Sequence, residues 1–325
     1  MLTSPDFFHT AVAEDLQRVD QEIRQVLSSD VKLVDKVVRY LIRRKGKSLR
    51  PILTLLAARL FGRPSDQAIK VAVIVELLHT ATLVHDDVVD ESYERRGFPS
   101  INAIWKNKVS VLVGDYLLAK ALTEMLDLRN FTVLDILSTT ARRMSRGELL
   151  QIAKARKLDI TEEVYFDMIG DKTAALFSAC CELAAVTAGR DGIERVSLRD
   201  FGEKLGLAFQ IRDDILDFSG KNILIGKPVL GDVKERKITL PLIYAMNNAK
   251  NPEGRGILKL IERGVKTHDR GKLLAFLHEN KGIESAERTA ERLRDEALAA
   301  LERFPETEPR RILEQFAYFT VSRSK

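Results

Sequence analysis

The chain has 325 residues, which is enough for one large domain or two ordinary ones. Apolar residues make up 45% of it and charged residues 30%, a balance that is typical of folded globular proteins and excludes a wholly disordered chain. The net charge of +5 is the small difference between 52 basic and 47 acidic residues, and no dense basic stretch with interleaved aromatics occurs, so nucleic-acid binding is not indicated.

The predicted elements are helices along almost the whole chain. Ala, Leu, Glu, Lys and Arg dominate, and apolar residues recur at steps of three and four, as at positions 52, 55, 56 and 60. Gly and Pro interrupt this pattern near residues 62–64, 97–99, 189–192, 226–228 and 251–252. Because no Ser- or Gly-rich linker divides the chain, we predict one all-α domain over residues 1–325, a bundle of ten or more helices.

The N-terminus and the cysteines indicate in which cellular compartment the protein is expected. The first ten residues carry acidic and polar side chains where a signal peptide needs an apolar core, and no run approaches the roughly 18 apolar residues of a membrane span. Cys180 and Cys181 are adjacent and would point about 100° apart on a helix, which favours neither a disulfide nor a metal site. We expect buried thiols in a reducing compartment and a cytoplasmic protein.

Two clusters of the form Asp-Asp-x-x-Asp carry the strongest functional signal. They are Asp86, Asp87 and Asp90, and Asp213, Asp214 and Asp217, and each ends an apolar stretch. The first and fifth residues of a cluster lie about one helical turn apart on one face, where like charges repel and burial is costly unless cations neutralise them. Hard oxygen ligands suit Mg²⁺, which shares its shell with phosphates, so two facing clusters are predicted to hold several Mg²⁺ ions around one diphosphate. One such cluster alone is as readily a solvated helix end, and the duplication favours the metal site.

Basic residues near the clusters are candidates for binding a diphosphate. Residues 46–51 are Gly-Lys-Ser-Leu-Arg-Pro, and Pro51 biases Arg50 out of the helical region, so Lys47 and Arg50 are expected in a loop at a helix N-terminus, where anions are favoured. Arg95 and Arg96 follow the first cluster, Gly-Asp-Lys-Thr at 170–173 opens an apolar helix, and Gly-Lys-Pro at 226–228 follows the second cluster. None has the spacing of a Walker loop, and each basic residue taken singly is better explained as a surface charge than as a ligand.

Two histidines lie near the first cluster. His79 is seven residues before Asp86, two turns along the same face, and suits either a core histidine or a ligand. His85 adjoins the cluster on a different face, so we expect it to be structural.

The chain resembles the trans-isoprenyl diphosphate synthases of the long-chain, octaprenyl- or heptaprenyl-synthase type. The resemblance runs from about residue 45 to residue 246 and rests on motifs that stand in the family's order. They are Gly-Lys-Ser-Leu-Arg-Pro (46–51), His-Thr-Ala-Thr-Leu-Val-His-Asp-Asp-Val-Val-Asp-Glu-Ser (79–92), Arg-Arg-Gly (95–97), Gly-Asp-Tyr-Leu-Leu-Ala-Lys-Ala (114–121), Gly-Glu-Leu-Leu-Gln (147–151), Lys-Thr (172–173), Phe-Gln-Ile-Arg-Asp-Asp-Ile-Leu-Asp (209–217) and Lys-Ile-Thr-Leu-Pro (237–241).

The resemblance implies a helical fold around a central apolar cavity, a homodimer and about three Mg²⁺ ions per active site. It implies that isopentenyl diphosphate is held by Lys47, Arg50, His79 and Arg96. It implies that the allylic diphosphate is held by Arg95, Lys172, Thr173, Gln210, Lys227 and Lys237. Most Mg²⁺ ligation would come from Asp86, Asp90 and Asp213, with Asp87, Asp214 and Asp217 in or near that shell. The bulky Leu230 departs from the family pattern and puts the role of Asp232 in doubt more than that of Lys227.

The implied activity is that of a prenyltransferase of isoprenoid biosynthesis, a transferase of alkyl groups other than methyl. The allylic C–O bond ionises, the double bond of isopentenyl diphosphate attacks the cation, and a proton is lost, for which the released diphosphate can serve as acceptor. Ala81 and Thr82, five and four residues before Asp86, are small where the family uses bulky aromatics to stop growth, so a long product is expected. Met125 and Leu137 are candidates for the floor of the cavity, or are ordinary core residues.

Two other functions remain open from the residues. A terpene cyclase shares the first cluster, but it would usually carry an Asn/Ser/Glu metal motif in place of the second. A non-catalytic partner subunit of a heteromeric synthase would tend to lose one cluster or the basic pocket, and this chain keeps both. The mildly basic tail from residue 310 to 325 contains aromatics and suggests loose contact with a membrane surface when the product leaves.

Overall fold

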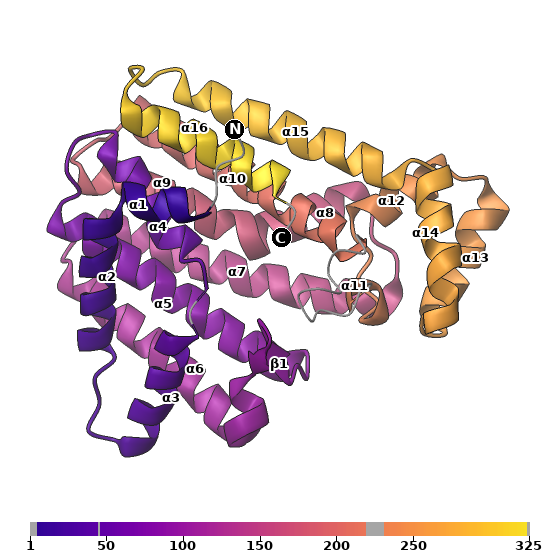
Figure 1. Cartoon of the computed structure of the whole chain (residues 1–325), viewed down its shortest axis with the longest axis horizontal. Coiled ribbons are helices and arrows are strands. Elements are labelled where there is room, and N and C mark those ends of the chain that lie inside the picture. The colour runs from indigo at the N-terminus through magenta and orange to yellow at the C-terminus, as the bar shows by residue number, and fades with distance from the viewer. Residues whose placement is uncertain (1–4, 45, 219–230, 324–325) are drawn as a thin grey trace. The chain divides into compact units, whose positions relative to one another are not determined.

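The computed structural model describes residues 5–44, 46–218 and 231–323, and its regular structure is almost entirely helical (Figure 1). The helices are α1 (Pro5–Ala11), α2 (Ala13–Val26), α3 (Lys32–Arg43), α4 (Leu49–Arg59), α5 (Asp66–Val89), α6 (Ile101–Asp127), α7 (Phe131–Lys157), α8 (Glu162–Ile169), the π-helix η1 (Gly170–Ala174), α9 (Ala175–Thr187), α10 (Ile193–Phe218), α11 (Gly231–Lys234), α12 (Leu240–Asn248), α13 (Asn251–Glu262), the 3₁₀-helix η3 (Thr267–Asp269), α14 (Arg270–Glu279), α15 (Gly282–Leu301) and α16 (Glu308–Ser322). The prediction of an all-α fold is confirmed.

The chain divides into two compact units, and each is described by itself. The first comprises Met1–Ala141, Ala179–Arg199 and Leu301–Phe316, and the second comprises Arg142–Ser178, Asp200–Ala300 and Ala317–Lys325. The first unit therefore contains the first aspartate cluster and the second unit contains the second cluster. Helices α7, α9, α10 and α16 contribute residues to both units, as does α15 through its last residue, Leu301.

Helix α5 is the central helix of the first unit. It packs against α2, α4 and α6, which lie beside it in Figure 1. Its N-terminus is capped by Ser65, whose hydroxyl accepts a hydrogen bond from the Ala68 amide at 3.2 Å. The helix is long and apolar enough to cross a membrane, contrary to the expectation that no such run occurs, but 61% of its most apolar stretch is buried within the protein. Burial on several faces is what a central bundle helix requires.

The core of the second unit forms where α8, α10, α12, α14 and α15 meet. It includes the fully buried side chains of Tyr165, Ile211, Leu240, Leu273 and Ala286. Helix α8 begins at the cap residue Thr161, which accepts a hydrogen bond from the Val164 amide at 3.3 Å. These packed helices provide the frame on which the second aspartate cluster is held.

Two local features differ from the simplest reading of the sequence. Helix α4 begins at Leu49, so Arg50 lies in its first turn and not in the preceding loop; Pro51 disfavours a helical Arg50 but does not forbid it. Ser48 takes the left-handed conformation (φ 46°) that starts the helix.

The cysteines are as expected: Cys180 and Cys181 are buried free thiols, and burial raises the pKa of Cys180 to about 12.

Candidate active site

The first aspartate cluster lies at the C-terminal end of α5. Asp86 and Asp87 belong to its last turn, and Asp90 follows the helix with its amide donating to the Asp86 carbonyl at 2.8 Å. Asp86 is half-buried and Asp90 is exposed, whereas Asp87 is buried. The predicted one-turn separation of Asp86 and Asp90 is therefore present, and Asp87 has a different environment.

Asp87 is paired with Arg95. The Arg95 Nε donates to both carboxylate oxygens of Asp87, at 2.8 and 2.9 Å, and Nη2 lies 2.7 Å from Oδ1. The Asp87 backbone carbonyl accepts a hydrogen bond from Asn102 Nδ2 at 3.0 Å. A bidentate pair of this kind neutralises a buried carboxylate and fixes the guanidinium in one orientation. Asp87 therefore orients Arg95 at the edge of the cluster.

A short hairpin presents the two arginines. Strands β1 (Glu94–Arg95) and β2 (Phe98–Pro99) pair antiparallel, with Arg95 opposite Phe98. The two turn residues, Arg96 and Gly97, both have positive φ (55° and 77°), as a two-residue hairpin turn of the primed type requires. The Arg96 guanidinium lies against Gly46, since a Cβ added there would come within 2.3 Å of Arg96 Cζ. The hairpin thus brings Arg96 to the loop that precedes α4.

Basic residues of the first unit surround His79. Arg50 Nη1 lies 2.8 Å from His79 Nε2. Burial lowers the pKa of His79 well below its ordinary value, and the positive charges of Arg50, Arg96 and Arg95 lower it further. Burial and Arg95 also lower the pKa of Arg96. A group of cations that repel one another in this way is suited to an anionic ligand.

The remaining predicted residues of the first unit are also placed. The backbone carbonyl of Lys47 lies 3.0 Å from His9 Nε2 of α1. Ala81 is buried in α5, and the Thr82 hydroxyl donates to the His79 carbonyl at 2.9 Å. Met125 and Leu137 are fully buried in α6 and α7, as either core or cavity-floor residues would be. His85 lies 3.2 Å from the Val111 carbonyl and 3.4 Å from Asp115 Oδ1 on α6, consistent with a structural role.

The second aspartate cluster occupies the C-terminal end of α10. Asp213 Oδ1 accepts a hydrogen bond from Nη2 of Arg323 in the C-terminal tail at 2.7 Å. Asp217 accepts from the amides of Gly231 and Asp232, both at 3.2 Å, and so caps α11. The two outer carboxylates of the cluster therefore bind neighbouring segments, Asp213 the C-terminal tail and Asp217 the start of α11. Lys227 and Leu230, which the sequence singled out, lie outside the described residues.

Asp214, the middle carboxylate, is buried in a chain of hydrogen bonds. It accepts from Tyr165 Oη at 2.6 Å and from Gln210 Nε2 at 2.8 Å, and the Thr173 hydroxyl donates to Gln210 Oε1 at 2.7 Å. Burial and the nearby charge of Asp232 raise the pKa of Asp214 well above its ordinary value. A cation beside these carboxylates would relieve the repulsion, so the hard oxygen donors of this group fit a divalent metal.

Lys172 lies on η1 and points towards α7. Its Nζ donates to Gln151 Oε1 at 3.2 Å and forms an ion pair with Glu148. The backbone of η1 comes so close to α7 that a Cβ on Gly147 would lie 2.5 Å from the Lys172 amide nitrogen. The motif at 147–151 contributes only to the family resemblance, and the sequence does not predict the contacts of Glu148 and Gln151 with Lys172.

A cavity of about 120 Å³ lies beside Lys172 in the second unit. It brings together three lysines, two aspartates, polar side chains and an apolar wall. Its lining residues are Gln151, Lys154, Ala155, Ile160, Met168, Ile169, Lys172, Gln210, Asp214, Asp232, Lys237, Ile238 and Thr239. Lys172, Gln210 and Lys237 were predicted to hold the allylic diphosphate, and Lys154, which forms an ion pair with Asp159 at 3.1 Å, was not.

Within the described ranges, no three Asp, Glu, His or Cys side chains gather closely enough to hold a metal by themselves. Carboxylate oxygens are hard ligands of the kind that Mg²⁺ accepts, and Mg²⁺ usually keeps part of its shell for water and phosphate oxygens.

An all-helical fold with two aspartate clusters, each accompanied by basic side chains, is typical of the class of isoprenyl diphosphate synthases. Residues 31–277 match the model of the polyprenyl synthetase family, and the chain belongs to this family. It is a prenyltransferase, a long-chain trans-polyprenyl diphosphate synthase, as the resemblance implied, and its substrates are isoprenyl diphosphates. Polyprenyl synthetases use divalent metal ions.

Three relatives illustrate the similarity. The octaprenyl diphosphate synthase of Escherichia coli K12 is 37% identical over 96% of this chain and 97% of its own. The crystal structure of a decaprenyl diphosphate synthase from Rhodobacter capsulatus matches with a TM-score of 0.93 at 40% identity, covering 99% of this chain and 100% of that one. A polyprenyl synthase from Caulobacter crescentus CB15, complexed with calcium and isoprenyl diphosphate, matches with a TM-score of 0.93 at 38% identity, covering 100% of this chain and 99% of that one.

Proposed function

We propose that this chain joins isopentenyl diphosphate head-to-tail to an allylic diphosphate in an Mg²⁺-dependent reaction of ionisation, condensation and elimination. The observation that carries the proposal is that each aspartate cluster has, within its own unit, basic side chains held in place by other residues. Arg50 and Arg96 surround His79 in the first unit, and Lys172 lies with Thr173 and Gln210 in the second. Two separate groups of cations match a reaction with two diphosphate substrates. We also propose that the whole chain, residues 1–325, acts as a single domain.

The first group would bind isopentenyl diphosphate through Lys47, Arg50, His79 and Arg96. His79 is neutral at pH 7 because its pKa is depressed. Arg50 has only donors, so His79 Nε2 accepts from Arg50 Nη1 and the ring proton sits on Nδ1. His79 would therefore offer one N–H to a diphosphate oxygen while Arg50 and Arg96 supply the charge.

The second group would bind the allylic diphosphate. Lys172 and Lys237 supply positive charge, the Thr173 hydroxyl and Gln210 amide supply hydrogen bonds, and we extend this role to Lys227 and Arg95 from the family resemblance. These cations stabilise the charge that builds on the leaving diphosphate as the C–O bond breaks. Apolar side chains such as Met168 and Ile169 beside Lys172 exclude water, which would otherwise quench the carbocation to an alcohol.

About three Mg²⁺ ions would be held by Asp86, Asp90 and Asp213, with Asp214 and Asp217 nearby. Bound Mg²⁺ would supply electrostatic stabilisation of the departing diphosphate. Asp87 has a narrower part in this proposal, because both of its carboxylate oxygens already bind Arg95. The proton lost in the elimination passes to the released diphosphate, so no side-chain base is required.

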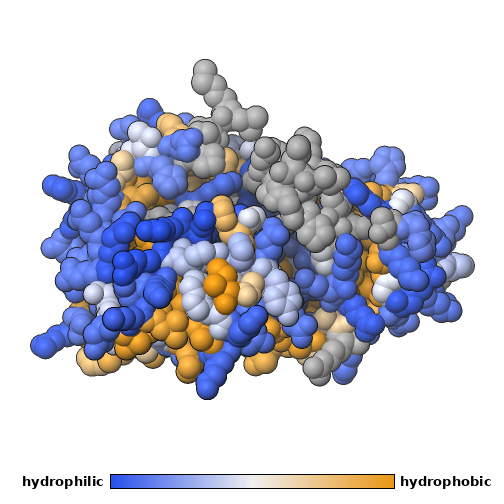
Figure 2. Space-filling model, turned by 60° about the horizontal axis from the view of Figure 1, so that its bottom comes forward, coloured by the Kyte–Doolittle hydropathy of each residue, from blue (hydrophilic) through white to orange (hydrophobic). Residues whose placement is uncertain are grey.

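The small residues Ala81 and Thr82 leave room beneath the first cluster for a growing chain, which supports a long product, and Met125 and Leu137 are proposed to limit it. We also propose a cytoplasmic homodimer that touches the membrane loosely through its tail. Support for the dimer is a stripe of exposed apolar side chains on α6, at helical spacing: Val111, Leu118, Leu122 and Leu126. Figure 2 shows apolar side chains gathered along the lower edge of that view.

The proposed function is tested with the purified chain, isopentenyl and farnesyl diphosphates and Mg²⁺, with the product identified by mass. One relative, from Geobacillus stearothermophilus, is named heptaprenyl diphosphate synthase component 2, so the assay must use this chain alone. We expect chain extension, and its absence would favour a partner-subunit role. Asp86→Ala and Asp213→Ala should each lower turnover by about a thousandfold or more with the helical circular dichroism intact. Asp127→Ala, at an exposed position on α6, serves as the control.

A further inference from the structure

Lys172 and Thr173 lie in a π-helix, and this wide turn sets the direction of both side chains. In η1 the Gly170 carbonyl accepts from the Ala175 amide, five residues on, where an α-helix would use residue 174. π-Helical turns are rare and often lie at functional sites. Here two adjacent side chains of this turn contact different helices, Lys172 towards Gln151 on α7 and Thr173 towards Gln210 on α10.

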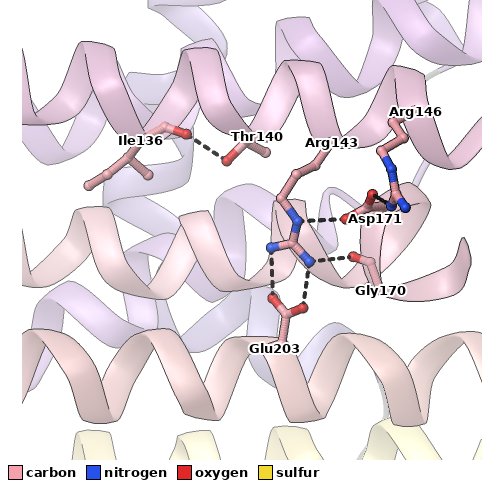
Figure 3. Close-up of polar contacts among 7 residues, drawn as sticks. All are labelled: Ile136, Thr140, Arg143, Arg146, Gly170, Asp171 and Glu203. Atoms are coloured by element: carbon pink, nitrogen blue, oxygen red, sulfur yellow. Dashed lines mark hydrogen bonds and ion pairs between the residues drawn. The ribbon is translucent and has the colours of Figure 1, made fainter. Parts of the chain in front are cut away.

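Arg143 on α7 supports this turn from outside. Its Nη2 donates to the Gly170 carbonyl at 3.2 Å, and its Nε donates to Asp171 Oδ1 at 2.8 Å (Figure 3). The Gly170 carbonyl thus has two donors, Arg143 and Ala175, and Asp171 is held immediately before Lys172. Although burial acts to raise it, hydrogen bonds from Arg143 and Arg146 hold the pKa of Asp171 below its usual value.

Glu203 on α10 holds the Arg143 guanidinium in the required plane. Arg143 Nη2 lies 2.7 Å from Glu203 Oε1 and Nη1 lies 3.3 Å from Oε2, which makes a fork-to-fork pair (Figure 3). Such a pair fixes the orientation of the guanidinium as well as its position. Arg146 is the other partner of Asp171, but its side chain is 56% exposed.

We propose that Arg143 and Glu203 are positioning residues for the allylic diphosphate, which they serve by maintaining the π-helix that directs Lys172 and Thr173. The inference rests on the proposed role of these two residues in binding that substrate. Neither Arg143 nor Glu203 needs to touch the substrate. Without the guanidinium, the turn can relax to α-helical bonding, which rotates Lys172 or Thr173 by about 100° about the helix axis. Either the contact of Lys172 with Gln151 or that of Thr173 with Gln210 is then lost.

The test uses the double variant Arg143→Met/Glu203→Met, because removing one partner alone would leave a half-buried charge and destabilise the protein. Binding of a non-reactive thiolo analogue of farnesyl diphosphate is measured by calorimetry with Mg²⁺, and binding of isopentenyl diphosphate is measured separately. We expect affinity for the analogue to fall by about tenfold or more and affinity for isopentenyl diphosphate to stay within about twofold. In steady state, KM for the allylic substrate should rise by a similar factor.

Two matched controls separate positioning from general stability. Arg195→Met/Glu182→Met removes another pair of a half-buried arginine and a carboxylate, 2.8 Å apart, in the first unit. Arg146→Met removes the second partner of Asp171 without disturbing the contact of Arg143 with Gly170. Both should bind the analogue as the unaltered chain does. Arg143→Lys keeps the charge but not the fork, and we expect it to remain defective for the allylic substrate alone.

The inference is overturned if the double variant binds the analogue normally, or if affinity for both diphosphates falls equally. It is also overturned if Arg195→Met/Glu182→Met or Arg146→Met reproduces the defect. Lys172→Ala distinguishes the two levels of the argument. If it loses the analogue while the double variant keeps it, only the positioning role fails; if it binds the analogue normally, the proposed role of Lys172 fails and the inference fails with it.

Discussion

The close approach of η1 to α7 makes Gly147→Ala the sharpest test of how the second unit presents Lys172. The added Cβ would lie 2.5 Å from the Lys172 amide nitrogen and 2.9 Å from its Cα and Cβ. These atoms belong to the backbone or its first side-chain carbon, so no flexible side-chain end can move aside. The backbone at Lys172 must therefore retreat by about 1 Å to reach ordinary van der Waals contact.

Two opposing effects set the stability of this variant. Alanine in place of glycine stabilises a helix interior by about 1 kcal/mol, and overpacking costs about 1–3 kcal/mol. The net loss of stability is therefore about 0–2 kcal/mol. Catalysis is more sensitive, because a displacement of about 1 Å at a positioned group can cost about a hundredfold in rate. We expect turnover with farnesyl diphosphate to fall by about ten- to a hundredfold, with KM for the allylic substrate raised.

The measurement pairs a steady-state assay, in which radiolabelled isopentenyl diphosphate is incorporated, with thermal unfolding. Gly256→Ala is the matched control, since Gly256 lies within α13 and a Cβ there meets no atom within 4 Å. That variant should be equally active and slightly more stable. Turnover of Gly147→Ala within about threefold of the unaltered chain would refute the reasoning, as would an equal rise of KM for both substrates.

Three further outcomes are expected. Ala81→Phe should shorten the product by at least one isoprene unit, and an unchanged mass distribution would show that the growing chain runs elsewhere. His79 has a depressed pKa in the folded protein, so below about pH 6.5 the unfolded state binds a proton that the folded state does not, and the free energy of unfolding decreases as the pH is lowered, by up to about 1.4 kcal/mol per pH unit. The variant His79→Gln should reduce this slope in urea titrations between pH 7 and 5.5. Parallel slopes for the two proteins would contradict the assignment. Arg323→Gln removes the partner of Asp213 and should lower the free energy of unfolding by about 1–2 kcal/mol, allowing for the half-exposed carboxylate; a change below about 0.3 kcal/mol would show the pair to be incidental.

Asp87 shows how far a sequence pattern reaches. The spacing of the first cluster correctly separates Asp86 and Asp90, one turn apart, from the residue between them. It says nothing of Arg95, whose bond to Asp87 depends on a hairpin with two residues at positive φ. Gly97 is consistent with a turn at this position, but the motif does not predict that the folded hairpin places Arg95 against Asp87.

The contacts of Lys172 make the same point for the second unit. The sequence identifies Lys172 as a candidate ligand from its motif. It does not assign a role to Glu148 or Gln151, which occur in another motif, or to Arg143 and Glu203, which occur in none. Lys172 meets Glu148 and Gln151, and Arg143 meets Glu203, because α7, η1 and α10 pack together. Gly147 was the available signal, since a glycine in a helical stretch often marks a close approach.

The sequence by itself determined that this protein is helical and that it binds diphosphates with the help of cations. Those properties follow from local periodicity and from carboxylates that cannot be placed together without a positive partner. Only the tertiary structure decided which partner each charged group has: Arg95 for Asp87, Arg323 for Asp213, and Glu148 for Lys172. Such pairings join residues that are far apart in the chain, and they are set by how helices pack, which periodicity along one helix does not specify.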